Sequence, residues 1–172
     1  MKRAPSLLAN WLADARGTAI VEVALVFPFM ALIIFGTLET GNLIYQQHVI
    51  TKGVQEAARY AARSPALIET AACPPANASW LAVADQAKNV ATRGRVASTA
   101  SYILPNFKTA DVTVSVTCGS ATGFVSSNPA SGQIPVVVVS ASVSASTLGF
   151  LGFVGLPSFT LTATHREMGI GL

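Results

Sequence analysis

The hydrophobicity pattern contains one long apolar run close to the N-terminus. Residues 18–38 (TAIVEVALVFPFMALIIFGTL) carry a single charged side chain, that of Glu22. A helix needs about 20 mostly apolar residues to cross the hydrocarbon core of a bilayer, so this run is long enough. Pro28 and Gly36 lie within it, but both residue types are tolerated in membrane helices. The pattern predicts a transmembrane helix over residues 18–41.

Helical periodicity continues beyond this run. Across residues 43–63 the apolar positions recur at helical spacing and form one narrow stripe. The stripe consists of Ile50, Val54, Ala57 and Ala61. Ser64 precedes Pro65, and a residue before proline avoids the helical region. We expect one helix over residues 18–63, about 70 Å long, whose projecting part belongs to a segment over residues 42–65.

The remaining chain, residues 66–172, has the pattern of a small α+β head. Ser79 is a suitable N-cap for a second helix over about residues 80–100, because its hydroxyl can accept a backbone hydrogen bond in the first turn. We expect one face of this helix to pack on a sheet. That face contains Trp80, Val83, Ala84, Ala87, Val90 and Ala91.

Three segments of the head have the pattern of strands. Residues 111–118 (DVTVSVTC) alternate strictly between apolar and polar side chains, as in a half-buried strand. Residues 136–144 and 158–165 are further strands, rich in β-branched side chains. Turn-forming residues fill the connections at 119–135 and 147–157. The expected fold class is α+β, with an antiparallel sheet of three or more strands.

The composition agrees with a membrane-anchored chain. Hydrophobic residues make up 51% and charged residues 11% of the sequence, about half the charged share of a soluble domain. Lys2, Arg3 and Arg16 precede the apolar run. Because basic residues favour the cytoplasmic side, we expect a cytoplasmic N-terminus and an external head. The net charge of +3 and the scattered basic residues do not favour nucleic acid as a partner.

Two simpler interpretations of the N-terminal segment remain open. A secretory signal would have a shorter apolar region followed by an A-x-A-like site, and residues 36–47 (GTLETGNLIYQQ) offer no such site. An uncleaved anchor for a periplasmic binding or enzymatic domain would explain the length of the run. It would not explain Glu22, because a carboxylate in lipid costs about 2.5–3.5 kcal/mol at mid-helix and less near the interface.

The residues around Glu22 resemble a type IV prepilin processing site. Arg16 and Gly17 are followed by the run TAIVE, which begins at Thr18. In that family the prepilin peptidase cuts after the glycine, on the cytoplasmic side, and a glutamate becomes the fifth mature residue. Counted from Thr18, Glu22 is the fifth residue. The resemblance implies that residues 1–17 are a leader and that Gly17 and Thr18 flank the cleaved bond.

The wider stretch R-G-x-x-x-V-E-x-A-L-V-x-P, over residues 16–28, is similar to the TadE-like minor pilins of tight-adherence pili. The similarity is extended by Gly36, Glu39, Gly41 and the AARYAA run at 57–62. It implies a minor pilin or pseudopilin of the bacterial inner membrane with a periplasmic head. The implied partners are a prepilin peptidase, the major pilin, other minor pilins and inner-membrane pilus platform proteins. A type II secretion pseudopilin remains an alternative.

Two acidic residues are candidates for assembly roles. After cleavage Thr18 would carry a new ammonium group, which Glu22 could neutralise in its own subunit or in a neighbour. The attraction is strong in low dielectric, but desolvation cancels much of it, so the expected gain is axial register. Glu39 lies at the outer end of the span, where the simpler interpretation is an interfacial residue facing solvent. The alternative is a packing or assembly role.

Cys73 and Cys118 lie far apart and in no CxxC arrangement, so they do not indicate a zinc site. In a cytosol they would be two buried thiols, whereas in an oxidising compartment they would pair. Because we place the head outside the cytoplasm, we expect one intramolecular disulfide.

No constellation of residues indicates catalysis. The two histidines, His48 and His165, lie far apart, and the acidic residues Glu69, Asp85 and Asp111 are spread over a loop, a helix and the start of a strand. GxSxG, SxxK and P-loop motifs are absent from the sequence, as are metal-ligand clusters. We therefore expect no enzymatic activity, no metal and no cofactor.

Overall fold

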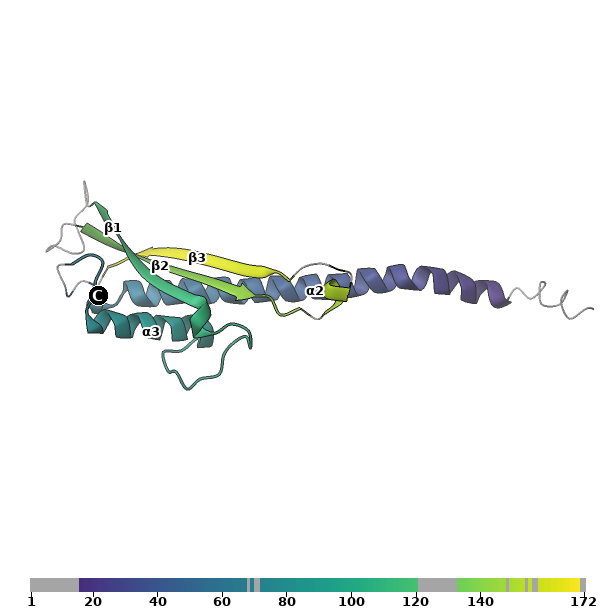
Figure 1. The fold of residues 1–172 in the computed structure, drawn as a ribbon, viewed down its shortest axis with the longest axis horizontal. Helices are drawn as coiled ribbons and strands as arrows, with labels where there is room; N and C mark the ends of the chain where they lie inside the picture. Colours follow the sequence, from purple (N-terminus) through teal and green to yellow (C-terminus); the bar gives the residue numbers. More distant parts are fainter. Residues whose placement is uncertain are drawn as a thin grey trace, which may run out of the picture. The chain divides into compact units, whose positions relative to one another are not determined.

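The computed structural model describes residues 16–67, 69, 72–120, 133–147, 149–153, 155 and 158–170 (Figure 1). Its helices are α2 (Arg16–Ala62), α3 (Ala78–Arg93) and the short α4 (Phe150–Phe153). Its strands are β1 (Val112–Ser120), β2 (Gln133–Ser144) and β3 (Thr160–Met168), and two 3-10 turns are η1 (Pro65–Leu67) and η2 (Thr109–Asp111). The predicted α+β class is confirmed.

The chain divides into two compact units, Met1–Gly41 and Asn42–Leu172. The described part of the first unit is the N-terminal half of α2, and nearly all of its large apolar side chains are exposed. An 18-residue window of this helix has a mean hydropathy of 2.4, so it is long and apolar enough to cross a membrane. Pro28 lies inside the helix without ending it.

The second unit contains a three-stranded antiparallel sheet in the order β1-β2-β3. Val139 in the central strand pairs with Val114 on one side and with His165 on the other. Alternation along the strands places mostly apolar side chains on one face and mostly hydroxyl side chains on the other, although His165 and Glu167 of β3 share the face of Val139 and Val137. The buried members of the apolar face are Val112, Val116, Val137, Val139, Ala141, Val143 and Ala163.

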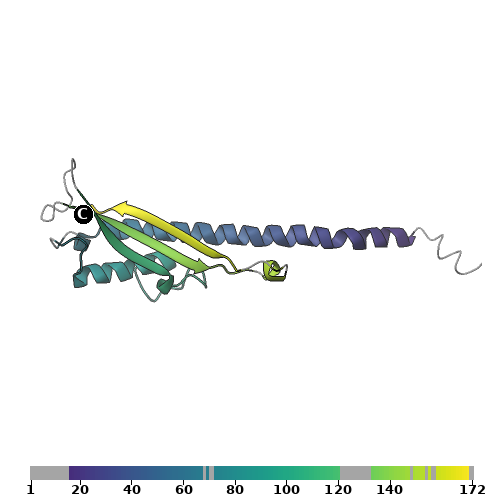
Figure 2. The same ribbon diagram turned by 45° about the horizontal axis from the view of Figure 1, so that its top comes forward.

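The predicted apolar stripe of the projecting helix is confirmed. Its four members are fully or almost fully buried in the core, together with Ala58 and Ala62. The stripe is wider than predicted because α2 contacts two partners, the sheet and α3. Figure 2 shows the three strands side by side along this half of α2, with α3 on the same side of the sheet as α2. From α3 the core receives Trp80, Ala84, Ala87 and Ala91.

The predicted ends of the second helix are wrong at both termini. Its N-cap is Asn77, not Ser79, because the Asn77 side-chain oxygen accepts the backbone N–H of Trp80 at 3.1 Å. The helix ends at Arg93, well before residue 100. Gly94 follows with φ at 69°, a left-handed conformation that glycine adopts without a Cβ clash, and it donates its N–H to the carbonyl of Val90.

Two hydrogen bonds fasten β3 to α2, one near each end of the strand. Gln47 donates its side-chain N–H to the carbonyl of Thr162 at 3.0 Å. Beyond the last residue of the strand, Ile170 donates its backbone N–H to the carbonyl of Ala62 at 3.0 Å. These two bonds connect β3, the last strand in the sequence, to α2, the first helix of the second unit.

Gly53 allows α2 and α3 to approach closely. A Cβ at this position would overlap the backbone carbonyl oxygen of Ala91, which cannot move without shifting α3. We expect Gly53→Ala to destabilise the second unit, because overpacking costs about 1–3 kcal/mol and the gain in helix propensity is only about 1 kcal/mol. The measurement is thermal unfolding followed by circular dichroism.

The matched control is Gly41→Ala in the same helix, where an added Cβ would meet no atom within 4 Å. Its melting temperature should stay level or rise, because only helix propensity changes. An equal rise for Gly53→Ala would show that the two helices are not in close contact.

Candidate functional site

The residues of the predicted processing site lie in the first turns of α2. Gly17 is exposed, and no atom lies within 4 Å of the position that a Cβ would take. Thr18 is helical as well, whereas residues 1–15 of the expected leader lie outside the described residues. A small, accessible residue at this position is what a peptidase that cuts after glycine requires.

Glu22 lies one helical turn beyond Thr18, about 6 Å along the axis. Its carboxylate is exposed and borders a shallow hollow of about 250 Å³. The other residues lining the hollow are all apolar: Val23, Val26, Phe27 and Met30. In the described part of the chain, the ion pairs join Glu56 to Arg59, Asp85 to Lys88 and His165 to Glu167. Glu22 therefore places an acidic group on an apolar helix face, where a cation from another chain could reach it.

Glu39 is 0% exposed, so it does not face solvent as the simpler interpretation expects. It lies about 25 Å from Glu22 along the helix axis, too far for the two carboxylates to act on one group. Its assembly role stays a prediction.

Cys73 and Cys118 form a disulfide, with their Cα atoms 6.0 Å apart. The bond joins the segment before α3 to strand β1, and the residues between them include all of α3. It is thus a covalent link between two elements of the core, not a group placed for chemistry at a surface.

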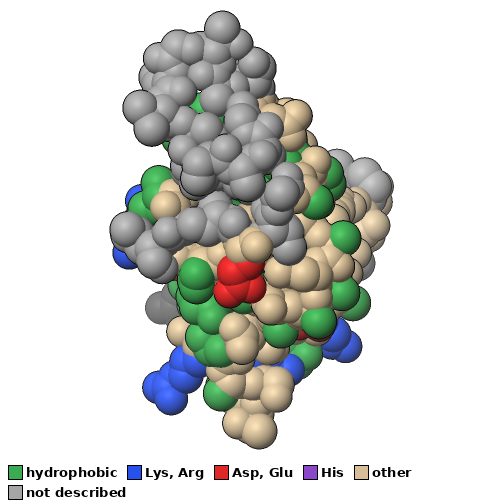
Figure 3. Space-filling view, turned by 90° about the vertical axis from the view of Figure 1, so that its left-hand side faces the viewer, with side chains coloured by type: hydrophobic (Ala, Val, Ile, Leu, Met, Phe, Trp, Pro, Cys, Tyr) green, Lys and Arg blue, Asp and Glu red, His purple; other side chains and the backbone are tan. Residues whose placement is uncertain are grey.

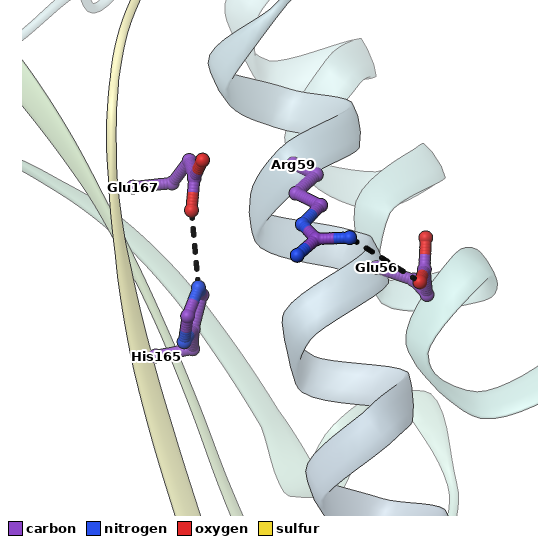
Figure 4. Close-up of polar contacts among 4 residues, drawn as sticks. All are labelled: Glu56, Arg59, His165 and Glu167. Atoms are coloured by element: carbon purple, nitrogen blue, oxygen red, sulfur yellow. Dashed lines mark hydrogen bonds and ion pairs between the residues drawn. The ribbon is translucent and has the colours of Figure 1, made fainter.

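The ion pairs among the described residues of the second unit are local. His165 Nε2 lies 3.0 Å from Glu167 Oε2 on β3, and Arg59 lies 3.9 Å from Glu56 on α2 (Figure 4). Each pair joins residues of one element. In the part of the chain that the structure describes, no group of three or more His, Cys, Asp or Glu side chains could hold a metal ion.

The other titratable candidates from the sequence also have local roles. His48 and Glu69 are exposed. Asp85 pairs with Lys88 at 2.9 Å in α3, and the Asp111 carboxylate accepts the backbone N–H of Lys108 at 2.8 Å in the turn before β1. None of these contacts orients a nucleophile or a general base.

Sequence analysis missed a polar cluster around Gln46, which we call the Gln46 clasp. Gln46 is buried in α2 and donates its side-chain N–H to the carbonyl of Ser146 at 2.7 Å. Its side-chain oxygen accepts the backbone N–H of Ser146 and a side-chain N–H of Asn106, at 3.0 and 3.1 Å. Asn42 also donates to the Ser146 carbonyl, at 2.9 Å. The partners are far apart in sequence, so no spacing could have revealed the cluster.

Comparison with protein families gives a match in the N-terminal part of the chain. Residues 17–59 match the family model of TadE-like proteins. The match begins at Gly17, contains Glu22 and Glu39, and ends within α2, before the head. Neither the comparison with curated proteins nor that with solved structures gives a match. The resemblance stated from the sequence is confirmed as a match to the TadE-like family over residues 17–59.

Proposed function

We propose that this chain is a minor pilin or pseudopilin that takes part in assembly of a tight-adherence (Flp-type) pilus. A prepilin peptidase cleaves it after Gly17. The observation that carries the proposal is the TadE-like match, which starts at Gly17 and lies on a helix with an exposed apolar surface. The position of Glu22, five residues after the glycine, supports the processing site.

In this proposal residues 1–17 are the leader, residues 18–41 cross the bacterial inner membrane, residues 42–65 project, and residues 66–172 complete a periplasmic head. The N-terminus is cytoplasmic. The partners are the prepilin peptidase, the major pilin, other minor pilins and the inner-membrane platform proteins of the pilus. The exposed apolar surface of α2 supports this arrangement, because it suits lipid before assembly and neighbouring helices afterwards.

The mechanism follows from the first turns of α2. Cleavage of the bond between Gly17 and Thr18 creates an ammonium group at the cytoplasmic edge of the membrane. The Glu22 carboxylate can neutralise that group when a neighbouring helix brings it alongside. An ion pair inside an apolar bundle forms only when the two helices are in register, so it fixes the axial position of the subunit.

The test of this proposal is the mass of the mature protein. In a host with an active prepilin peptidase we expect intact mass spectrometry to show a chain that starts at Thr18. Gly17→Leu should remain almost wholly in the precursor form, because a bulky side chain replaces the small residue at the cleaved bond. The matched control, Gly36→Leu in the same helix, should be cleaved normally.

Two results would contradict this proposal. If the wild-type chain keeps Met1 in a host whose peptidase processes its other substrates, the chain is an uncleaved membrane anchor. If Gly17→Leu is cleaved as well as wild type, the cleaved bond lies elsewhere.

A further inference from the structure

One end of the second unit exposes apolar side chains next to the point where the proposed membrane segment ends. Ile44 and Tyr45, in the first turn of α2 within this unit, are 55% and 59% exposed. Phe159, just before β3, is 38% exposed. Large apolar side chains exposed at one end of a unit are consistent with a surface that another apolar phase or partner covers.

Hydrogen bonds fix the start of the β2–β3 connection beside the turn of α2 from which Ile44 and Tyr45 project. Asn42 donates to the carbonyl of Ser146 at 2.9 Å, and the Gln46 clasp binds the same residue through both its backbone N–H and its carbonyl. The adjacent Ala145 donates its N–H to the carbonyl of Phe159 at 2.8 Å. The start of the β2–β3 connection is therefore fixed beside Asn42, and Phe159 is fixed beside the start of that connection.

The connection between β2 and β3 contains no charged residue. Residues 145–159 read ASTLGFLGFVGLPSF, and Phe150–Phe153 within them form α4. Figure 2 shows α4 beyond the ends of β2 and β3, at the end of this unit that lies away from the C-terminus. The described part of the opposite end, in Figure 3, shows basic and acidic side chains beside hydrophobic ones. Charged side chains are thus present there, whereas the connection between β2 and β3 has none.

We propose that Ile44, Tyr45, α4 and Phe159, which we call the collar, contact the membrane interface on the side of the head. The collar would be a second membrane-binding element beside the transmembrane helix. This inference rests on the proposed function, because it requires residues 18–41 to span the bilayer. Asn42 directly follows Gly41, so every group bonded to Asn42 or Ser146 lies close to the level at which α2 leaves the lipid.

The chemistry of the collar fits the interface between lipid headgroups and acyl chains. Aromatic side chains are enriched at this level of a bilayer. An uncharged apolar surface with polar backbone groups can lie about 5–10 Å into the boundary without burying a charge. The sequence of the connection is rich in phenylalanine, leucine and glycine, and Tyr45 offers a ring with a hydroxyl that can stay in water.

The experiment measures the depth of nitroxide labels in the full chain, reconstituted in vesicles of phosphatidylethanolamine and phosphatidylglycerol. Labels are placed one at a time through Phe159→Cys and Tyr45→Cys, with the native disulfide left intact. Accessibility to oxygen, which concentrates in lipid, is compared with accessibility to a water-soluble nickel complex. Thr113→Cys, at an exposed position on β1, is the matched control, and Ile33→Cys reports on the span.

We expect the labels at residues 159 and 45 to be severalfold more accessible to oxygen, relative to nickel, than the label at residue 113. Suppose that the labels at residues 159, 45 and 113 are equally accessible to nickel while the label at residue 33 lies in lipid. The collar proposal would then be wrong, and the proposed membrane topology would stand. A water-accessible label at residue 33 would instead overturn the membrane topology of the proposed function. If protection at residues 159 and 45 disappears on dilution to one chain per vesicle, the collar binds a second copy and not lipid.

Discussion

Replacing Glu22 by glutamine is expected to abolish pilus assembly while leaving cleavage after Gly17 intact. Glutamine keeps the size of the side chain and most of its hydrogen bonding but removes the charge. Removing one partner of a buried ion pair costs about 3–5 kcal/mol, which is more than about a hundredfold in an association constant. The measurement combines the ratio of mature to precursor protein with pilus production in cells that lack the native copy.

The matched control is Glu56→Gln, another exposed glutamate on α2, whose contact with Arg59 at 3.9 Å is weak. This variant should assemble normally. Normal pili from Glu22→Gln would show that the charge is dispensable. Loss of cleavage together with loss of assembly would place the role of Glu22 in recognition by the peptidase.

Removing the disulfide is expected to produce the largest loss of stability in the head. Cys73 and Cys118 are separated by 45 residues, and closing a loop of that length stabilises a fold by roughly 4 kcal/mol in the chain-entropy model. That is a large share of the about 5–15 kcal/mol typical of a domain. In the Cys73→Ser, Cys118→Ser double variant, we expect the melting temperature to fall by roughly 15 °C.

Wild-type protein measured with a reductant is the control, and it should melt close to the double variant. Thiol labelling of the unreduced native protein should find neither cysteine free. Full labelling of both in cells would place the head in a reducing compartment, against the proposed topology. An unchanged melting temperature without the bond would mean that packing alone fixes α3 against the sheet.

Strong local patterns made the main elements of this fold predictable. The length and composition of the apolar run were enough to predict a helix that could span a membrane. The strict alternation of residues 111–118 matches β1 closely. The strand expected to begin at residue 136 begins at Gln133, because Ile134 and Pro135 pair with Gly119 and Cys118. Pairing across strands extends an element beyond its own periodic pattern.

Features that depend on contacts between distant residues could not be predicted. Asn77 and Ser79 are both suitable N-caps, and only the path of the chain selects Asn77. The need for glycine at position 53 comes from the backbone of Ala91 in another helix. For the candidate site, the sequence could propose Gly17, Thr18 and Glu22 because their spacing along one helix is local. The sequence left both a solvent-facing and a packing role open for Glu39, and only the structure shows that it is buried.

The two hydrogen bonds that fasten β3 to α2 have a mechanical consequence. A force that draws α2 along its axis reaches β3 near its start, through Gln47 and Thr162, and beyond its end, through Ala62 and Ile170. The strand therefore carries part of the tension between these two attachment points. Within the second unit, a load on the helix is thus shared by the packed core and by both attachments.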